Sequence, residues 1–344
     1  MTHTLAEALA LRPNDHQAVR AAFETRTGVA WHTSTPARFA QGRPVSVVIP
    51  ARDTGHAMGP CLDALAAQDT NGAVEVIVVD DGSSDDTAHI AAVHPAVDIL
   101  VRLRAPSGAA AARNAGTRLA ASDTVGYLDA DMVMPPHALA DFAARARDQL
   151  VLTGFRHNVP YSLRAEGGPH VPAHPADLAA DHRVTWRSSG GRQLYSGRVL
   201  DGPTTGSPLN DTADFQQLGY GVFYLDWDLA RTVVTAALCV PRAAVLEVGG
   251  FDETFGRIGW GMEDTHLGAA LIASGCLVAP LRQTVGYHLD APDAEDQWQT
   301  KLAGWSKTLA YYRQLLQAPV PFGRQASFGQ RTDVLLKDAR VSTR

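Results

Sequence analysis

Two aspartates one residue apart, Asp129 and Asp131, end an apolar run in the stretch "VGYLDADMVMPP" at 125–136. On an extended backbone the side chains of residues i and i+2 point to the same side, so both carboxylates can reach one object. A divalent metal ion is the ligand that two converging carboxylates suggest. The pair alone leaves a second interpretation open, because a strand that ends before a helix near Pro135 also favours a capping aspartate.

The elements expected to position these acids lie between Val45 and Gln149, where short β-branched runs alternate with alanine-rich amphipathic stretches. This pattern is typical of β-α units on a parallel sheet. The strands are predicted at 45–50, 74–81, 98–103 and 124–131, and the helices at 58–69, 84–93, 108–121 and 136–148. Ser84 is the expected cap of the second helix. The two aspartates then stand at the carboxyl end of the fourth strand.

Charged residues also follow the other three predicted strands. They are Asp53, Asp80, Asp81, Arg102 and Arg104. Ligands of open parallel sheets bind beyond the carboxyl ends of the strands. Carboxylates mixed with arginines at one edge therefore predict a site for a ligand that is both polar and anionic.

Residues 157–230 contain many Gly, Pro, Ser and Thr residues and little periodicity, which predicts a mobile substrate loop. Its histidines, His170, His174 and His182, lie in proline-rich sequence without regular spacing, so we assign them no metal. The chemistry is expected at the strand ends and in the segment that follows this loop.

After the loop come an apolar strand, a short helix, a glycine-rich turn and a helix that begins near Glu263. Leu267, Ala270 and Leu271 recur at helical spacing, which predicts one buried face. Glu263 and Asp264 then occupy the first turn of this helix. Two acids there either complement the helix dipole or serve a site, and the pair alone does not decide between them.

Composition narrows the class of protein. With 344 residues, 45% of them hydrophobic, and a net charge of -6 without a block of Lys and Arg, the chain is expected to be globular and not to bind nucleic acid. Cys61, Cys239 and Cys276 lie far apart in apolar surroundings, which predicts reduced core cysteines. No apolar run is long enough to span a membrane and no basic start precedes an apolar block, so we expect a cytoplasmic protein.

The two ends of the chain are predicted to be helical. Residues 1–44 suit one or two helices. The segment 296–317 carries a stripe at steps of four and three residues, formed by Trp298, Leu302, Trp305, Leu309, Tyr312 and Leu316. This stripe is expected to dock on the body of the protein, and pairing with a second subunit as a homodimer remains the alternative.

Six segments in a fixed order resemble one known family. They are "VVIPARD", "VIVVDDGSSDDT", "GAAAARNAG", "YLDADM", "GGFDETF" and "GWGMED", followed by "YHLD". Together they are similar to a family 2 glycosyltransferase of the GT-A fold. The resemblance covers about residues 45–290 and implies a nucleotide-binding half at 45–150 and an acceptor half at 151–290, with helical extensions at 1–44 and 291–344.

The resemblance also implies roles for residues on the donor side. Pro50 and Asp53 are expected to line the nucleoside pocket, and Asp81 to accept the N–H of uracil. Arg113 and Asn114 match positions beside the nucleotide and its diphosphate.

The D-x-D acids receive different roles from the resemblance. Asp131 is expected to bind Mn²⁺ or Mg²⁺ directly, and Asp129 to contact the ribose or a water molecule on the metal. His288 matches a histidine that completes the metal shell in several relatives. Such a cation neutralises the charge that grows on the leaving diphosphate.

On the acceptor side, "GWGMED" resembles the W-G-x-E-D segment of inverting relatives, so Asp264 is the predicted general base. Glu263 is expected to hold acceptor hydroxyls, and Trp260 to stack on a sugar. No Q-x-x-R-W motif is present, which favours single addition to a soluble acceptor over processive synthesis. The prediction is an inverting, metal-dependent hexosyltransferase that uses a nucleotide-sugar, with UDP as the expected carrier.

Three other functions are alternatives to this prediction. A nucleotidyltransferase acting on sugar phosphates would need a lysine-rich phosphate loop, whereas "PARDTGHAMG" contains no lysine. A dinucleotide-dependent oxidoreductase would need G-x-G-x-x-G after a strand. A catalytically silent protein that binds sugar nucleotides stays open, although the presence of Asp129, Asp131 and Asp264 argues against it.

Overall fold

The computed structural model describes residues 3–12, 14–39, 44–70, 74–165, 167–174 and 229–344. The predicted substrate loop at 157–230 falls largely outside these residues, and so does His182. His170 and His174 are described, and neither belongs to a cluster of possible metal ligands in this part of the chain.

The described strands form one mixed sheet of 9 strands in the order β5-β8-β6-β7-β4-β1-β2-β3-β9. Its centre consists of the four predicted strands, β1 (Val45–Ala51), β2 (Val74–Asp80), β3 (Ile99–Arg102) and β4 (Thr124–Leu128). They pair in parallel, with Val48 of β1 opposite both Ile77 of β2 and Tyr127 of β4. Their β-branched residues are buried because helices cover both faces. The predicted α/β fold is confirmed.

The five described strands outside this centre add four antiparallel pairs and one parallel pair. They are β5 (Met132–Val133), β6 (Leu150–Val159), β7 (Ala237–Pro241), β8 (Leu277–Leu289) and β9 (Arg340–Thr343). Of these strands, only β7 was predicted. Pro280 and Gly286 interrupt the strand pattern of β8, and β9 exposes all of its side chains. The pairing of β5 with β8 sets Met132 opposite His288. This pairing places His288 beside the D-x-D, although the two are far apart in the sequence.

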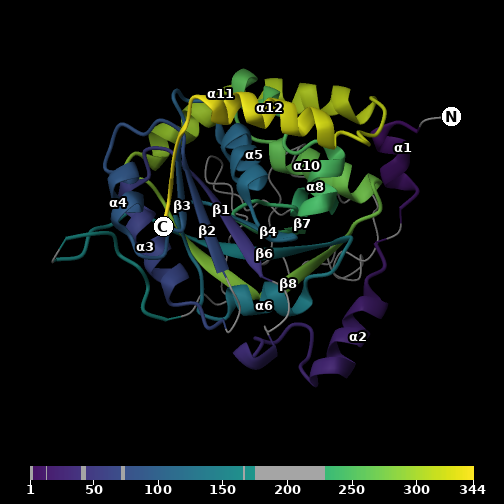
Figure 1. The fold of residues 1–344 in the computed structure, drawn as a ribbon, viewed down its shortest axis with the longest axis horizontal. Coiled ribbons are helices and arrows are strands. Elements are labelled where there is room, and N and C mark those ends of the chain that lie inside the picture. The colour runs from purple at the N-terminus through teal and green to yellow at the C-terminus, as the bar shows by residue number, and fades with distance from the viewer. Residues whose placement is uncertain (1–2, 13, 40–43, 71–73, 166, 175–228) are drawn as a thin grey trace.

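Helices cover both faces of the sheet (Figure 1). One face carries α1 (Leu5–Ala10), α5 (Ala109–Leu119), α8 (Arg242–Val248), α9 (Thr254–Ile258), α10 (Glu263–Ala273), α11 (Ala294–Leu316) and α12 (Gln325–Lys337). The other carries α2 (Gln17–Thr27), α3 (Gly55–Ala66), α4 (Thr87–Val93) and α6 (Ala138–Arg145). Short 3-10 helices occur at Ala37–Phe39 and Leu229–Thr232. Each face of the sheet therefore has its own apolar core.

The start of α4 differs from the prediction. The helix begins at Thr87 with Asp86 as its N-cap residue, so the assignment of Ser84 as the cap is wrong. Ser84 instead donates hydrogen bonds from its backbone N and its Oγ to Asp53 Oδ1, at 2.7 and 3.0 Å. This polar loop connects the ends of β1 and β2 rather than capping a helix.

Burial of α10 is more complete than its sequence pattern predicts. Every residue from Thr265 to Ala273 is buried, not only those on one face. The helix is enclosed because it packs against α1, α8 and the 3-10 helix at Leu229–Thr232. Glu263 and Asp264 therefore stand at the one end of α10 that is not enclosed.

The C-terminal helix α11 docks on the body of the protein, as expected. Leu309 and Tyr312 are buried in the core that also contains α10, and Trp305 and Leu316 pack against this core. This part of the stripe is therefore unavailable to a second subunit. The side chains of Trp298 and Leu302 lie outside the described part of the chain.

The three cysteines behave as predicted. Cys61, Cys239 and Cys276 are buried in the apolar cores and none forms a disulfide. In the part of the chain that the structure describes, no helix has the length and apolar character needed to cross a lipid bilayer.

Candidate active site

A cleft of about 630 Å³ opens at the carboxyl ends of β1, β2 and β4. Most of the predicted site residues line it: Pro50, Asp81, Arg113, Asp129, Asp131, Trp260, Glu263 and His288. The exceptions are Asp53, Asn114 and Asp264, which are absent from its lining. One space is thus surrounded by strand ends and by the starts of α5, α10 and α11.

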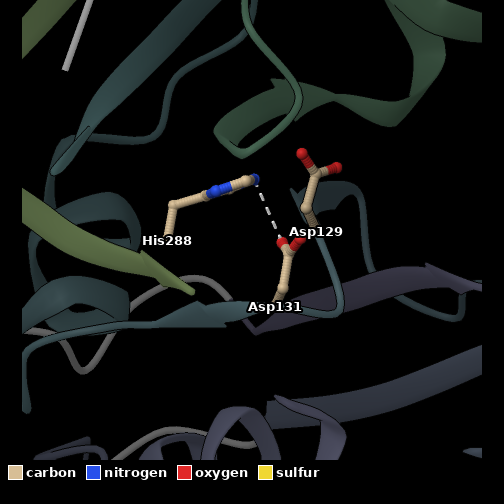
Figure 2. A group of neighbouring side chains, drawn as sticks. All are labelled: Asp129, Asp131 and His288. Carbon is tan, nitrogen blue, oxygen red and sulfur yellow. Dashed lines mark ion pairs between the residues drawn. The ribbon is translucent and has the colours of Figure 1, made fainter. Parts of the chain in front are cut away.

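Asp129, Asp131 and His288 form a cluster inside this cleft (Figure 2). One ligand atom from each lies within 4.8 Å of the others. His288 Nε2 lies 3.3 Å from Asp131 Oδ1, and the three side chains converge from the segment after β4 and from β8. The i, i+2 argument for the two acids therefore leads to a group of three possible ligands.

Electrostatics at this cluster favour a cation. Burial and the neighbouring Asp129 raise the pKa of Asp131 to about 7. Burial and Arg156 lower the pKa of His288 to about 4, so its imidazole is neutral at pH 7. Within the described part of the chain, Asp131 Oδ1 and His288 Nδ1 are buried without a hydrogen-bond partner. Two carboxylates and a neutral imidazole fit Mn²⁺ or Mg²⁺, whose charge would favour the ionised form of Asp131.

Arg113 makes the surroundings of Asp129 different from those of Asp131. Its Nη2 lies 2.9 Å from Asp129 Oδ1 and its Nη1 lies 3.4 Å from Glu263 Oε1. Burial alone would raise the pKa of Asp129, but Arg113 and His288 hold it below its ordinary value. Asp129 is therefore partly neutralised by an arginine in contact with it. For Asp131, Arg156 offsets only part of the rise in pKa, so Asp131 is the better suited of the two to bind a metal ion.

Asp81 lies at the end of the cleft formed by β2 and the segment before α5. It accepts hydrogen bonds from the backbone N of Ser107 at 2.6 Å and of Gly108 at 2.8 Å, just before α5. Burial raises its pKa against the effect of these hydrogen bonds. Each carboxylate oxygen keeps a further lone pair that can accept a base N–H. Asp53 lies at the rim instead, with its Oδ1 bound to Ser84.

Asn114 is the residue whose predicted place differs most from the structure. It was expected beside the nucleotide, but its side chain is fully buried and does not reach the cleft. Its Nδ2 donates to Phe251 O at 2.9 Å and to Glu253 Oε1 at 3.0 Å, and its Oδ1 accepts from Phe251 N at 2.9 Å. Asn114 holds the loop after α8 against α5, next to Arg113.

Replacing Asn114 with alanine is expected to lower the free energy of unfolding by about 2–4 kcal/mol, because the N–H and C=O of Phe251 lose their partners inside the protein. Chemical denaturation measures the change. Gln330→Ala removes an exposed amide from α12 and serves as the control, with an expected change within about 0.5 kcal/mol. Equal stability of the two variants would contradict the role assigned to Asn114.

The start of α10 carries two acids, Glu263 and Asp264. Glu263 lines the cleft and pairs with Arg113. Asp264 is partly exposed, its Oδ1 accepts from Thr265 N at 2.7 Å, and burial and Glu263 raise its pKa to about 6. Trp260 is 37% exposed and lies 5.7 Å from Lys301 Nζ, measured to the ring centroid. The Trp260 ring and Glu263 thus occupy one end of the cleft, and Asp264 lies next to Glu263 on α10 but outside the lining.

Sequence reasoning missed several polar residues of the cleft. They are Arg156 and Asn158 on β6, Asp290 after β8, and Gln297 and Lys301 on α11. The polar face of α11 carried a usable signal, because Gln297 and Lys301 are four residues apart and face the same side. Residues 156 and 158 offered none, since they fall in sequence that lacks a strand pattern.

Comparison with known proteins adds the family. Residues 46–188 match the model of Glycosyl transferase family 2. Validoxylamine A glucosyltransferase from Streptomyces hygroscopicus subsp. jinggangensis is 30% identical over 263 residues, which is 72% of this chain and 55% of that protein. Chondroitin synthase from Pasteurella multocida is 25% identical over 297 residues, which is 81% of this chain and 27% of that protein. The chain thus spans between about a quarter and just over half of the length of these relatives.

Among solved structures, the mannosyltransferase PcManGT from Pyrobaculum calidifontis, in complex with GDP-Man and Mn²⁺, is similar in fold. The TM-score is 0.50 at 18% sequence identity, with 96% of this chain and 81% of that chain covered. This likeness concerns the fold alone. From the family match, the relatives and the shared architecture, the chain belongs to the family 2 glycosyltransferases and has the GT-A fold.

Proposed function

We propose that this chain is an inverting, metal-dependent glycosyltransferase that moves a hexose from a nucleotide-sugar, with UDP as the carrier, to a hydroxyl of a soluble acceptor, one sugar at a time. The observation that carries the proposal is that one cleft joins the Asp129, Asp131 and His288 cluster to Glu263 at the start of α10, next to Asp264. The names of a glucosyltransferase relative and of a mannosyltransferase complex with GDP-Man and Mn²⁺ support it.

The domain organisation belongs to the same proposal. Residues 45–150 form the nucleotide-binding half and 151–290 the acceptor half of one domain, with extensions at 1–44 and 291–344. Leu5 of the first extension is buried in the core that contains α10, and β9 of the last one pairs with β3. Both extensions therefore complete the fold around the cleft.

On the donor side, Asp131, Asp129 and His288 would hold the divalent cation. When bound, such a cation supplies positive charge that stabilises the leaving diphosphate. Arg156 and Lys301 line the same cleft and add positive charge that attracts the donor. Pro50 and Asp81 then orient the nucleoside at the ends of β1 and β2.

On the acceptor side, Asp264 takes the proton of the attacking hydroxyl. A new bond forms between the acceptor oxygen and the anomeric carbon while the bond to the diphosphate breaks on the opposite face, which inverts the anomeric centre. Asp264 suits this role better than Glu263, because the carboxylate of Glu263 is already held by Arg113 Nη1 at 3.4 Å. A pKa of about 6 also brings Asp264 closer to neutral pH. Glu263 and Trp260 position the acceptor sugar.

The direct test is release of nucleoside diphosphate from a panel of sugar nucleotides in the presence of Mn²⁺, with and without EDTA. We expect release with at least one donor and its loss when EDTA removes the metal. A panel measured first by thermal unfolding selects the donor, because a bound ligand stabilises the fold. Release of pyrophosphate from a nucleoside triphosphate mixed with a sugar phosphate would indicate a nucleotidyltransferase. Donor binding without release, with acceptors supplied, would indicate a silent binding protein.

The pKa of Asp264 predicts an acid limb in the pH profile. The raised pKa of about 6 means that Asp264 loses its proton only as the pH rises through that value. Turnover is therefore expected to fall about tenfold per pH unit below about pH 6 and to level off above it. Initial rates at saturating Mn²⁺ and donor measure the profile. Turnover that stays constant from about pH 7 down to about pH 5 would contradict an acid of this pKa as the base.

A further inference from the structure

A second cavity, of about 320 Å³, lies away from the cleft. It is lined by the loop between α8 and α9, by α9 and α10, and by the segment that joins α11 to α12. It shares no lining residue with the cleft. No step of the proposed glycosyl transfer uses it.

Three arginines give this cavity its charge. Arg257, Arg324 and Arg331 line it, and all three are exposed to solvent. Arg257 donates to Thr254 Oγ1 at 3.2 Å and Arg331 donates to Gly249 O at 2.6 Å. Among the described residues, none of the three forms an ion pair. Three guanidinium groups around one small cavity therefore lack the anion that such groups recognise in pairs of parallel hydrogen bonds.

The acids of the cavity are bound by other groups. Asp252 accepts from Thr254 N at 2.9 Å and from Tyr311 OH at 2.8 Å, and Glu253 Oε1 accepts from Asn114 Nδ2 at 3.0 Å. Burial alone would raise the pKa of Asp252, but the hydrogen bonds from Thr254 and Tyr311 hold it below its ordinary value. These carboxylates keep their charge, but they are anchored to other groups, and among the described residues neither forms an ion pair with one of the three arginines.

His266 supplies a second, independent indication of a ligand. Its side chain lines the cavity, the residue is only 9% exposed, and its Nδ1 has no hydrogen-bond partner among the described residues. Burial lowers its pKa to about 4, so at neutral pH the ring is uncharged and offers one N–H. A buried imidazole without a partner is costly unless a ligand or water completes its hydrogen bonds.

We propose that this cavity binds a small anion that carries a phosphate group, with Arg257, Arg324 and Arg331 around the phosphate and His266 as a neutral partner. The volume lies at the lower end of the range of small-molecule pockets, about 300–1,000 Å³, which suits a phosphate monoester and not a whole nucleotide-sugar. The ligand is therefore distinct from the donor, and the site does not depend on the proposed transfer reaction.

The surroundings of the cavity give such a ligand a measurable effect. Gly249 and Gly250 have φ angles of +87° and +73°, which allow the loop to pass close to Arg324 and Asn114. The same loop is held on its other side by Asn114 of α5. A bound anion would tie this loop to α12, so it should raise the unfolding temperature in the absence of any nucleotide.

Titration calorimetry without metal or nucleotide tests the proposal, with inorganic phosphate and glucose 6-phosphate as separate probes. We expect binding of at least one probe, and a loss of about tenfold or more in affinity in the double variant Arg257→Gln/Arg324→Gln, because each lost charged hydrogen bond weakens binding. Arg313→Gln removes an exposed arginine of α11 that does not line the cavity, and Lys301→Gln removes a cation of the cleft. Both controls should bind like the wild type.

A measurement on the wild type keeps the test independent of how the variants fold. Phosphate should protect Arg257 and Arg324 from modification by phenylglyoxal and should leave Arg313 unprotected. Mass spectrometry measures the modification of each arginine. Absence of binding by both probes up to about 10 mM would overturn the proposal. So would affinity that falls in Lys301→Gln but not in the double variant, because the anion would then occupy the cleft.

Discussion

Replacing Asp264 with asparagine is expected to lower turnover by about 10²–10⁴-fold, the range for loss of a general base. Donor binding should change little, because Asp264 does not line the cleft that holds the donor residues. The asparagine keeps an Oδ1 that can accept from Thr265 N, so the start of α10 should retain its conformation. Single-turnover rates and donor affinity, measured separately, test the prediction.

The variant should not unfold. Since burial raises the pKa of Asp264 to about 6, the charged carboxylate disfavours the folded state at pH 7, and a neutral amide removes that cost. Thermal unfolding should therefore show equal or greater stability. Glu263→Gln is the matched comparison, and we expect it to raise the KM of the acceptor more than it lowers turnover. Unchanged turnover in Asp264→Asn would remove Asp264 from the mechanism.

Replacing Asp131 with alanine is expected to weaken Mn²⁺-dependent binding of UDP by about 100-fold or more, while binding without Mn²⁺ stays as in the wild type. The reason is that Asp129 is held by Arg113 at 2.9 Å, whereas Asp131 faces His288 at 3.3 Å. Its raised pKa also implies that its removal should not destabilise the protein in the absence of metal. Calorimetric titrations of UDP with and without Mn²⁺ measure both quantities.

Two further variants serve as comparisons for Asp131→Ala. Asp86→Ala removes an exposed aspartate at the start of α4 and should leave UDP binding unchanged. His288→Ala should show a smaller version of the Asp131 defect, because two carboxylates remain to hold the cation. If the wild type bound UDP equally well with and without Mn²⁺, the metal role of the whole cluster would be refuted.

The strands that place the acids could be predicted from the sequence because their signal is local. The runs at β1, β2 and β4 are β-branched and buried on both faces, and each ends in charged residues. The D-x-D and the strand-end acids followed from that pattern together with the family resemblance. The start of α4 was misplaced because Ser84 bonds a loop residue on the neighbouring strand end, a contact without local sequence signal.

Contacts between distant segments could not be predicted in the same way. Asn114 stands next to Arg113 in the sequence, yet one side chain points to the loop at 251–253 and the other to the cleft. On a helix, adjacent residues point about 100° apart, so a motif alone does not tell which of the two faces a ligand. Lys301 was not predicted for a related reason, because the prediction for α11 rested on its apolar stripe and not on its polar face.

The ladder between β5 and β8 also bears on how the protein folds. Asp131 and His288 come together only after the chain between them, including β6, β7 and α10, has been placed. Contacts of such long sequence separation form late, because closing a long loop costs entropy before any contact is gained. The cation site is therefore completed by the last parts of the sheet to assemble, and a partly folded chain would hold the two aspartates without their histidine.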